Sequence, residues 1–212
     1  VFGQKLFEIF KENRDWCEII GAKDIGTINK GIIEGHAKEI IQVSEALHER
    51  KFAIIADKIF QKKDKVKLVL IAGPSSSGKT TSSKRIALQL KVLGLNPIVI
   101  SMDDFFVDRE HTPKDENGNY DFESINALDL DLLNTELNQL FEGEEIVLPR
   151  FNFEAGSRTM DGKKIKMTGD DIVVMEGIHA LNPTLTEKIS PEKKFKVYAS
   201  ALTSLSIDEN NS

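Results

Sequence analysis

The sequence predicts an α/β fold: a doubly wound parallel sheet with helices on both faces, preceded by a small helical segment at the N-terminus. Two observations predict this class. From residue 66 onward, short apolar runs typical of strands buried on both faces alternate with helical segments. A loop of glycines and serines connects the first apolar run directly to the first of these helices, an arrangement typical of the carboxyl edge of such a sheet.

The N-terminal segment, residues 1–63, is predicted to be helical. One face of a first helix carries Leu6, Ile9 and Phe10. A later stretch, 36–60, has apolar residues at roughly helical spacing, namely Ile40, Val43, Leu47, Ile54 and Ile59. The charged residues 61–67 are interpreted as a linker. Because Val1 is not a natural start, we expect this segment to be the end of a larger upstream region.

The second predicted domain is 64–212. Four continuous apolar runs are predicted to be its buried strands: 67–73, 96–104, 171–177 and 194–200. Its helices are predicted over 81–94, which Gly94 closes, and over 129–143, with Asp129 or Asp131 near the start. Residues 144–153 and 163–167 are predicted to pair as an excursion around the turn-forming pair Asp161-Gly162.

Composition favours a soluble intracellular protein. The chain has 212 residues and a net charge of −6, with no basic run, which argues against nucleic acid as a partner. Cys17 is the only cysteine, so we expect a buried thiol in a reducing cytoplasm. No apolar run reaches the length of about 18 residues that a membrane span needs. We therefore expect a cytoplasmic protein that binds no membrane, and a homo-oligomer is left open.

Residues 73–80, with the sequence GPSSSGKT, match the pattern G-x-x-x-x-G-K-[ST]. In such a P-loop the glycines allow successive backbone N–H groups to point at phosphate oxygens, and the following helix adds its positive N-terminal end. The lysine reaches the β- and γ-phosphates and the threonine hydroxyl binds Mg²⁺. A chance match has a probability on the order of one per cent in a chain of this length. We therefore predict an ATP site formed by Gly73, Ser75, Ser76, Ser77, Gly78, Lys79, Thr80 and Thr81.

Acidic residues follow two of the predicted strands at the same edge as the P-loop. Asp103 and Asp104 end the second strand, and Glu176 ends the third. Each alone could be a cap or turn residue. Together, beside a phosphate-binding loop, they favour a Mg²⁺ site and a general base for a small-molecule kinase. We favour Asp103 over Asp104 as the base, and predict Lys79, Asp103 and Glu176 as catalytic.

The chain resembles the uridine kinase and phosphoribulokinase family over residues 67–202. The motifs that carry the resemblance are GPSSSGKTT, SMDDFF, YDFESINALD, LPRFNFEAGSR and DIVVMEGIHALNP, in this order. The resemblance implies a P-loop NTPase fold and Mg²⁺-dependent transfer of the γ-phosphate of ATP to the 5′-hydroxyl of a uridine- or cytidine-like nucleoside. Residues 1–63 are similar to the end of a threonyl-tRNA-synthetase-like region that precedes the kinase in one branch.

By position, the resemblance implies that Asp103 is the base and also approaches the metal, which Thr80 and Glu176 hold. It implies that Glu123 binds the ribose hydroxyls and that Phe151 and Arg158 face the nucleoside. Tyr120 is predicted to line the same pocket. For His179 two interpretations stay open: it contacts a phosphate or orients the acid, or it is a packed histidine, which is at least as well supported.

Three positions depart from the family pattern. Uridine kinases usually have Asp at Glu123, Tyr at Phe151 and His at Gly156, so the substrate choice could differ. The family also continues into a lid with phosphate-binding arginines, so we expect the chain to be C-terminally incomplete. Two alternatives stay open: a kinase of a sugar phosphate, held by Arg109, Arg150 and Arg158, and a nucleotide-sensing module without turnover.

Overall fold

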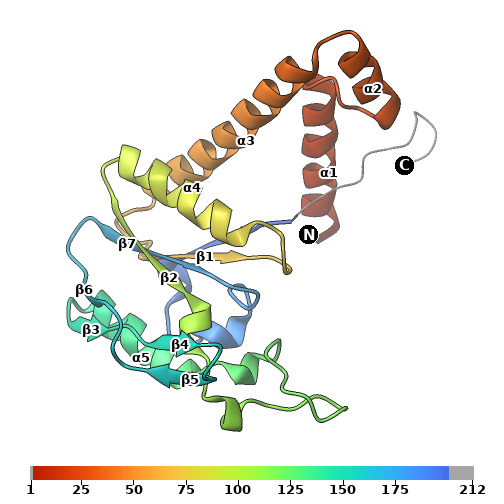
Figure 1. Cartoon of the computed structure of the whole chain (residues 1–212). Coiled ribbons are helices and arrows are strands. Elements are labelled where there is room, and N and C mark those ends of the chain that lie inside the picture. The colour runs from red at the N-terminus through yellow and green to blue at the C-terminus, as the bar shows by residue number, and fades with distance from the viewer. Residues whose placement is uncertain (1, 201–212) are drawn as a thin grey trace. The chain divides into compact units, whose positions relative to one another are not determined.

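The computed structural model describes residues 2–200, and their side chains from Phe7 onward (Figure 1). These residues form two compact units that divide after Ala53, within one helix. The predicted boundary after residue 63 differs from this division by the last turns of that helix. Each unit is described by itself below.

The first unit is helical, as predicted. Its elements are α1 (Phe2–Ile19), α2 (Ile25–Ile33) and the first part of α3 (Ala37–Phe60). Asp24 fixes the start of α2, because its carboxylate accepts hydrogen bonds from the Thr27 backbone N–H at 2.6 Å and from the Thr27 hydroxyl at 2.8 Å. Ile9 and Phe10, on the predicted apolar face of α1, are each 46% exposed. Apolar residues therefore remain on the surface of this unit.

The second unit contains a parallel four-stranded sheet, which confirms the predicted fold class. The strands are β1 (Leu68–Ala72), β2 (Asn96–Ser101), β7 (Asp171–Glu176) and β8 (Lys194–Tyr198), in the order β2-β7-β1-β8. All neighbouring pairs run parallel. Helix α4 (Lys79–Val92) lies on one side of the sheet in Figure 1, and α5 (Leu130–Phe141) lies on the other. The helix predicted to start at residue 81 begins two residues earlier.

Burial differs sharply between the central and the outer strands. All five residues of β1 and the middle four of β7 are buried. The prediction that 96–104 and 194–200 are also buried on both faces is wrong. Val99 of β2 is 45% exposed and Tyr198 of β8 is 63% exposed. Both strands lie at the edges of the four-stranded sheet, so within residues 2–200 each lacks a neighbour on one side.

The segment between α5 and β7 forms two small antiparallel ladders. Strand β3 (Glu145–Val147) pairs with β6 (Lys164–Lys166), as the predicted excursion requires. Strand β4 (Arg150–Asn152) instead pairs with β5 (Ser157–Thr159). Residues 150–153 were predicted to pair with 163–167, and this part of the prediction is wrong because the chain turns back earlier, at residues 153–156. We call β4, β5 and their turn the inner hairpin.

Short 3-10 turns complete the second unit: η1 (Met102–Phe105), η2 (Arg109–His111), η3 (Ile125–Ala127), η4 (Pro183–Thr186) and η5 (Pro191–Lys193). The predicted second strand therefore ends at Ser101, and Asp103 and Asp104 lie in η1. Ser101 caps this turn by accepting a hydrogen bond from the Asp103 N–H at 3.3 Å. Met102 and Phe105 of η1 are buried in the apolar core of this unit and thereby fix the turn. The same core includes Leu68, Leu70, Leu137 and Met175.

Candidate active site

The glycine-rich loop connects the carboxyl end of β1 to the start of α4. Gly78 has φ +81°, and Ser76 has φ +59°, a left-handed conformation that is uncommon for a residue with a side chain. Gly73 lies against the backbone just after β8, since a Cβ on Gly73 would overlap the Ala199 carbonyl oxygen. The same Cβ would lie 2.5 Å from Ser77 Oγ. These backbone conformations produce the concave loop that a phosphate group needs.

Two polar side chains of the loop, Lys79 and Ser77, differ in their hydrogen bonds. The Lys79 ammonium donates a hydrogen bond to the Pro74 carbonyl at 2.8 Å, so it lies over the loop rather than in bulk solvent. Ser77 Oγ is buried and has no hydrogen-bond partner among the described residues. A buried hydroxyl without a partner is costly, and a phosphate oxygen would satisfy it. The other predicted loop residues, Ser75, Thr80 and Thr81, are exposed.

The strand register brings the loop and the carboxylates to one edge. Glu176, the last residue of β7, is paired with Ile71 of β1 and with Ser101 of β2. The Thr80 hydroxyl donates a 2.7 Å hydrogen bond to Glu176 Oε1. Hydroxyl and carboxylate oxygens are ligands that Mg²⁺ prefers. Thr80 and Glu176 therefore form a pair that fits a magnesium ion next to the phosphate loop.

The two aspartates of η1 lie in different surroundings. The pKa of Asp103 is raised above its ordinary value, first by desolvation and then by the negative charges of Glu176 and Asp104, while Lys79 opposes the shift. The pKa of Asp104 is also raised by desolvation, but its neighbours are the Phe151 N–H, at 3.5 Å, and Arg150. Asp103 therefore lies near enough to Lys79 and Glu176 to interact with their charges, whereas the Asp104 carboxylate accepts a hydrogen bond from the inner hairpin.

Gly177 explains how η1 comes so close to the end of β7. A Cβ at this position would overlap Met102 Sδ and lie 2.9 Å from Met102 Cβ. Met102 is only 1% exposed and directly precedes Asp103. The glycine after Glu176 therefore lets the aspartate turn pack against the strand that carries the glutamate. Sequence reasoning missed this role of Gly177, although the glycine follows the acidic residue directly.

A second loop brings Glu123 towards the same strand end. The Glu123 side chain is exposed, and its backbone N–H donates to Asp121 Oδ1 at 3.0 Å. Its carbonyl oxygen lies 2.7 Å from Nε2 of His179, which is three residues beyond Glu176. Tyr120, in the same loop, is 42% exposed, and the Lys114 ammonium lies 5.5 Å from its ring centroid. Both predicted pocket residues are thus accessible to a ligand.

The aromatic residues of the inner hairpin differ in exposure. Phe151 is 7% exposed and packs against Phe106 and Phe153, with ring centroids 5.5 and 5.0 Å apart. Phe153, just beyond the end of β4, is 55% exposed. The ring that is accessible for stacking is therefore that of Phe153, which sequence reasoning did not select. Phe151 supports it from within the core.

Two of the three arginines near the hairpin donate hydrogen bonds, although Nη1 of Arg158 is buried without a partner among the described residues. Arg158 Nη2 donates to Asp129 Oδ2 at 2.8 Å, and the Arg158 backbone N–H donates to Asp108. Arg109 Nη2 donates to the Phe153 carbonyl at 2.6 Å. Gly156, with φ +68°, makes room for Arg109, since a Cβ there would lie 2.6 Å from the guanidinium carbon. Arg109 and Arg158 thus stabilise the inner hairpin, and Arg150 is exposed.

Among the described side chains, no three of His, Cys, Asp and Glu converge on a metal position. The candidate site supplies two carboxylates and one hydroxyl, from Asp103, Glu176 and Thr80. This set suits Mg²⁺, which usually takes one or two carboxylates and fills its remaining positions with water and substrate phosphates.

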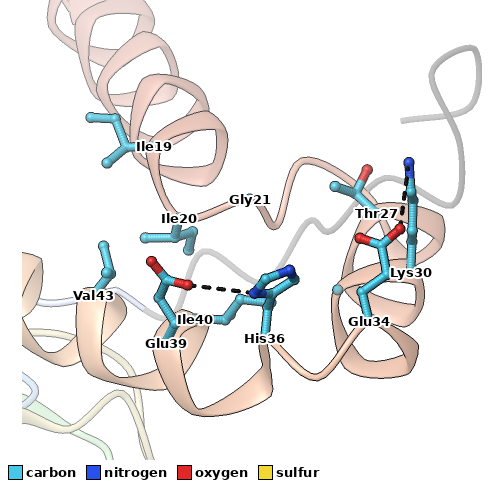
Figure 2. A pocket seen from close by; sticks show the side chains of 11 residues that line it. Ile19, Ile20, Gly21, Thr27, Lys30, Glu34, His36, Glu39, Ile40 and Val43 are labelled. Atoms are coloured by element: carbon cyan, nitrogen blue, oxygen red, sulfur yellow. Dashed lines mark ion pairs between the residues drawn. The ribbon is translucent and has the colours of Figure 1, made fainter.

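The first unit has a separate hollow of about 370 Å³ (Figure 2). Its lining includes the apolar residues Ile19, Ile20, Ile40 and Val43. Charged residues also line it as two ion pairs: Lys30–Glu34 at 3.9 Å and His36–Glu39 at 3.6 Å. These side chains are more than half exposed, and none of the predicted site residues lies here. All of the predicted site residues therefore belong to the second unit.

Comparison with known proteins agrees with this geometry. The model of the phosphoribulokinase / uridine kinase family matches residues 68–208. A uridine kinase of Schizosaccharomyces pombe is 37% identical over 120 residues, which are 55% of this chain and 25% of that protein. A uridine kinase of Halobacterium salinarum is 31% identical over 112 residues, 53% of this chain and 48% of that protein. The chain thus spans about half the length of these curated relatives or less.

A solved structure is similar over a larger share. It is described as a possible uridine kinase from Bacillus stearothermophilus, and it superposes with a TM-score of 0.55 at 26% identity. The match covers 70% of this chain and 79% of the other. The matched family segment includes the sheet, the phosphate loop and the inner hairpin, since it begins at β1 and extends beyond β8.

Proposed function

The chain belongs to the phosphoribulokinase / uridine kinase family, and on this premise we propose that the protein transfers the γ-phosphoryl group of ATP to the 5′-hydroxyl of a uridine- or cytidine-like nucleoside. The observation that carries the proposal is the convergence of Lys79, Asp103 and Glu176 at the phosphate loop. This grouping provides what phosphoryl transfer to an alcohol requires: phosphate binding, a metal position and a base.

The proposed steps follow from the positions of these residues. Loop N–H groups and the Lys79 ammonium bind the β- and γ-phosphates of ATP. Thr80, Glu176 and Asp103 would hold Mg²⁺, which would supply positive charge beside the phosphate oxygens. The Asp103 carboxylate accepts the proton of the acceptor hydroxyl. The hydroxyl oxygen forms a bond to the γ-phosphorus, the bond from this phosphorus to the β–γ bridging oxygen breaks, and ADP leaves.

The raised pKa of Asp103 supports its role as the base. A carboxyl group destabilised in its charged form by desolvation and by Glu176 is a stronger base than an ordinary aspartate. Asp104 is turned towards the inner hairpin, where it accepts from the Phe151 N–H. This difference in surroundings favours Asp103 over Asp104.

The acceptor side of the proposal is formed by the Glu123 loop and the inner hairpin. Glu123 would accept hydrogen bonds from ribose hydroxyls, with Tyr120 beside it and Phe153 available for stacking on a base. Phe151 would contribute from within the core, and Arg158 by holding the hairpin through Asp129. This assignment of the acceptor residues is part of the proposal.

The alternative of a sugar phosphate acceptor is less well supported. It requires free cations for the acceptor's own phosphate. Of the three arginines considered, Arg109 and Arg158 donate to the Phe153 carbonyl and to Asp129, and only Arg150 is exposed without such a bond. A nucleotide-sensing module without turnover would not need the base and the metal pair that we propose for this site.

A cytoplasmic location and the absence of a membrane partner are part of the same proposal. In the described part of the chain, no helix combines the length and the apolar character that crossing a membrane requires.

The test is Mg²⁺-dependent ADP release from ATP by the native protein, measured against a panel of nucleosides and sugar phosphates. Lys79→Ala and Asp103→Asn serve as inactive controls. We expect release with a pyrimidine nucleoside and its loss in both controls. Release only with a sugar phosphate would establish the alternative acceptor. Tight ATP binding without release for any acceptor would favour the sensing module.

A further inference from the structure

A histidine outside the catalytic grouping connects the two halves of the candidate site. His179 Nε2 lies 2.7 Å from the carbonyl oxygen of Glu123, 56 residues away in the sequence. A carbonyl oxygen can only accept, so the proton of this bond is on Nε2. The neutral tautomer with its proton on Nδ1 would place two lone pairs opposite each other. Both the Nε2–H tautomer and the imidazolium preserve the bond.

The backbone around His179 fixes the position of this residue. It follows Glu176, the last residue of β7, by three residues, and Gly177 packs closely on Met102 between them. The backbone after it is a tight turn, in which the Asn182 N–H donates to the His179 carbonyl at 2.8 Å. The ring therefore extends from a segment whose start carries the proposed metal ligand.

The peptide groups of Glu123 are fixed from both sides. Its N–H donates to Asp121 Oδ1 at 3.0 Å, a bond within its own loop. Its carbonyl accepts from His179, a bond from the end of β7. The carboxylate of Glu123 is exposed and stays available for a ligand. The backbone at this residue is thus held at two points while the side chain faces outwards.

We propose that His179 is a residue that positions the acceptor. Through its bond to the Glu123 carbonyl, His179 holds the Glu123 loop at a fixed distance from Asp103 and Glu176. The proposal rests on the proposed kinase function for its kinetic consequences, but the bond itself does not. Because Nε2 is occupied by the carbonyl, His179 neither abstracts the acceptor proton nor binds the transferred phosphate through this nitrogen. The role predicts an effect on acceptor binding that is separate from the chemical step.

The bond is tested first without any assay of activity. Long-range ¹H–¹⁵N NMR spectra of histidine-labelled native protein distinguish the two neutral tautomers and the imidazolium. His179→Gln removes one signal set and thereby assigns it. We expect His179 to carry its proton on Nε2 at every pH at which the protein is folded. A neutral Nδ1–H form of His179 would overturn the proposal, whatever reaction the protein catalyses.

The kinetic test compares three variants of the native protein. His179→Ala removes the donor, His179→Gln keeps an N–H near the position of Nε2, and His111→Gln changes a histidine whose side chain is 69% exposed. The bond between His179 and Glu123 lies at an exposed position, and loss of one such hydrogen bond commonly costs about 2- to 10-fold. We expect His179→Ala to raise KM for the nucleoside by about this factor, with KM for ATP, kcat and the pH profile of kcat unchanged. His179→Gln should restore most of the nucleoside affinity, and His111→Gln should match the native protein.

Each other outcome has a defined meaning. An unchanged nucleoside KM in His179→Ala would overturn the positioning role, as would a fall in kcat with an altered pH profile, which indicates proton transfer. Equal losses in His179→Ala and His179→Gln, with lowered thermal stability in both, would show a purely structural histidine and also overturn it. If the native protein phosphorylates no acceptor, the proposed function fails, and the NMR result still decides whether the bond exists.

Discussion

The hydroxyl of Thr80 donates a 2.7 Å hydrogen bond to Glu176 Oε1, although 96 residues separate them. Thr80 lies in the first turn of α4, and Glu176 is the last residue of the central strand β7. This bond joins the phosphate loop to the acidic end of the sheet. We propose that both oxygens bind the same Mg²⁺ ion, so the pair can be tested by its dependence on Mg²⁺.

Thr80→Ala removes the hydroxyl that contacts Glu176. We expect turnover at saturating ATP to fall at least ~10-fold and the Mg²⁺ concentration for half-maximal rate to rise, since loss of a residue that orients metal ligands commonly costs about 10–100-fold. Steady-state rates over a Mg²⁺ titration give both quantities. Thr80→Ser keeps the hydroxyl and should retain most of the activity. Similar Mg²⁺ curves for the alanine variant and the native protein would exclude Thr80 from the metal site.

Asp103→Asn and Asp104→Asn form a matched pair that identifies the base. A general base contributes roughly 10²–10⁴-fold to the rate, so Asp103→Asn should lower kcat by that factor. Asp104→Asn keeps an oxygen that can accept from the Phe151 N–H and should cost less than ~10-fold. Reversed effects would assign the base to Asp104.

The pH dependence of the rate provides a further test of Asp103. Its pKa is raised above the ordinary value of 3.8, and only the carboxylate can accept the acceptor proton. The rate should therefore fall as pH decreases through this raised pKa, earlier than an ordinary aspartate would cause. Profiles of kcat/KM measured down to the lowest pH at which the protein stays folded follow this acid limb. It should persist in Asp104→Asn, and the same acid limb in the residual activity of Asp103→Asn would contradict the assignment.

Local patterns were sufficient to predict the fold class and the phosphate loop, because each depends on residues close in sequence, whereas the roles of Asp103 and Glu176 stay a prediction. These patterns did not distinguish β2 from β7, since an apolar run carries no information about which strand lies at a sheet edge. The pairing of β4 with β5 depends on where the chain turns. The bond between His179 and Glu123 depends on how two distant loops pack. The features that could not be predicted are therefore mainly contacts between residues far apart in the sequence.

Gly73→Ala tests the close approach of the phosphate loop to the end of β8. The added Cβ would overlap the Ala199 carbonyl oxygen, which is backbone and cannot easily move. We expect a loss of about 1–3 kcal/mol in the free energy of unfolding, as for other overpacked sites, and at least ~10-fold weaker ATP binding. Denaturant titration and calorimetry measure the two. Gly169→Ala is the control, because a Cβ at that position would meet no heavy atom within 4 Å.

Phe151→Ala and Phe153→Ala should distinguish the ring that stabilises the inner hairpin from the ring that contacts the nucleoside. Phe151 is 7% exposed, so its truncation should cost about 3–5 kcal/mol of unfolding free energy. Phe153 is 55% exposed, so its truncation should cost about 1 kcal/mol or less while raising KM for the nucleoside. Urea titrations and initial rates provide the comparison. If Phe153→Ala leaves the nucleoside KM unchanged, this ring is not part of the acceptor pocket.

Glu136 of α5 should make the stability of the protein depend on pH near neutrality. It is 5% exposed, Oε2 has no hydrogen-bond partner among the described residues, and desolvation is the main cause that raises its pKa from 4.5 to about 7. The charge of Asp129 acts in the same direction, and Arg158 opposes it. In the unfolded chain this carboxyl titrates at its ordinary value. Between the two values the folded state binds more protons, so stability falls as pH rises.

Glu136→Gln is neutral throughout this range and should remove this pH dependence. The pKa shift of Glu136 corresponds to a loss of about 3 kcal/mol in the free energy of unfolding. The full loss is present only above the folded-state pKa of about 7. We therefore expect the variant to match the native protein near about pH 4.5 and to exceed it in unfolding free energy at about pH 8. Urea titrations from about pH 4.5 to 8.5 measure the difference, with Glu144→Gln as the exposed control. A Gln variant that is less stable at the alkaline end would show that the charged carboxylate stabilises the fold through Arg158.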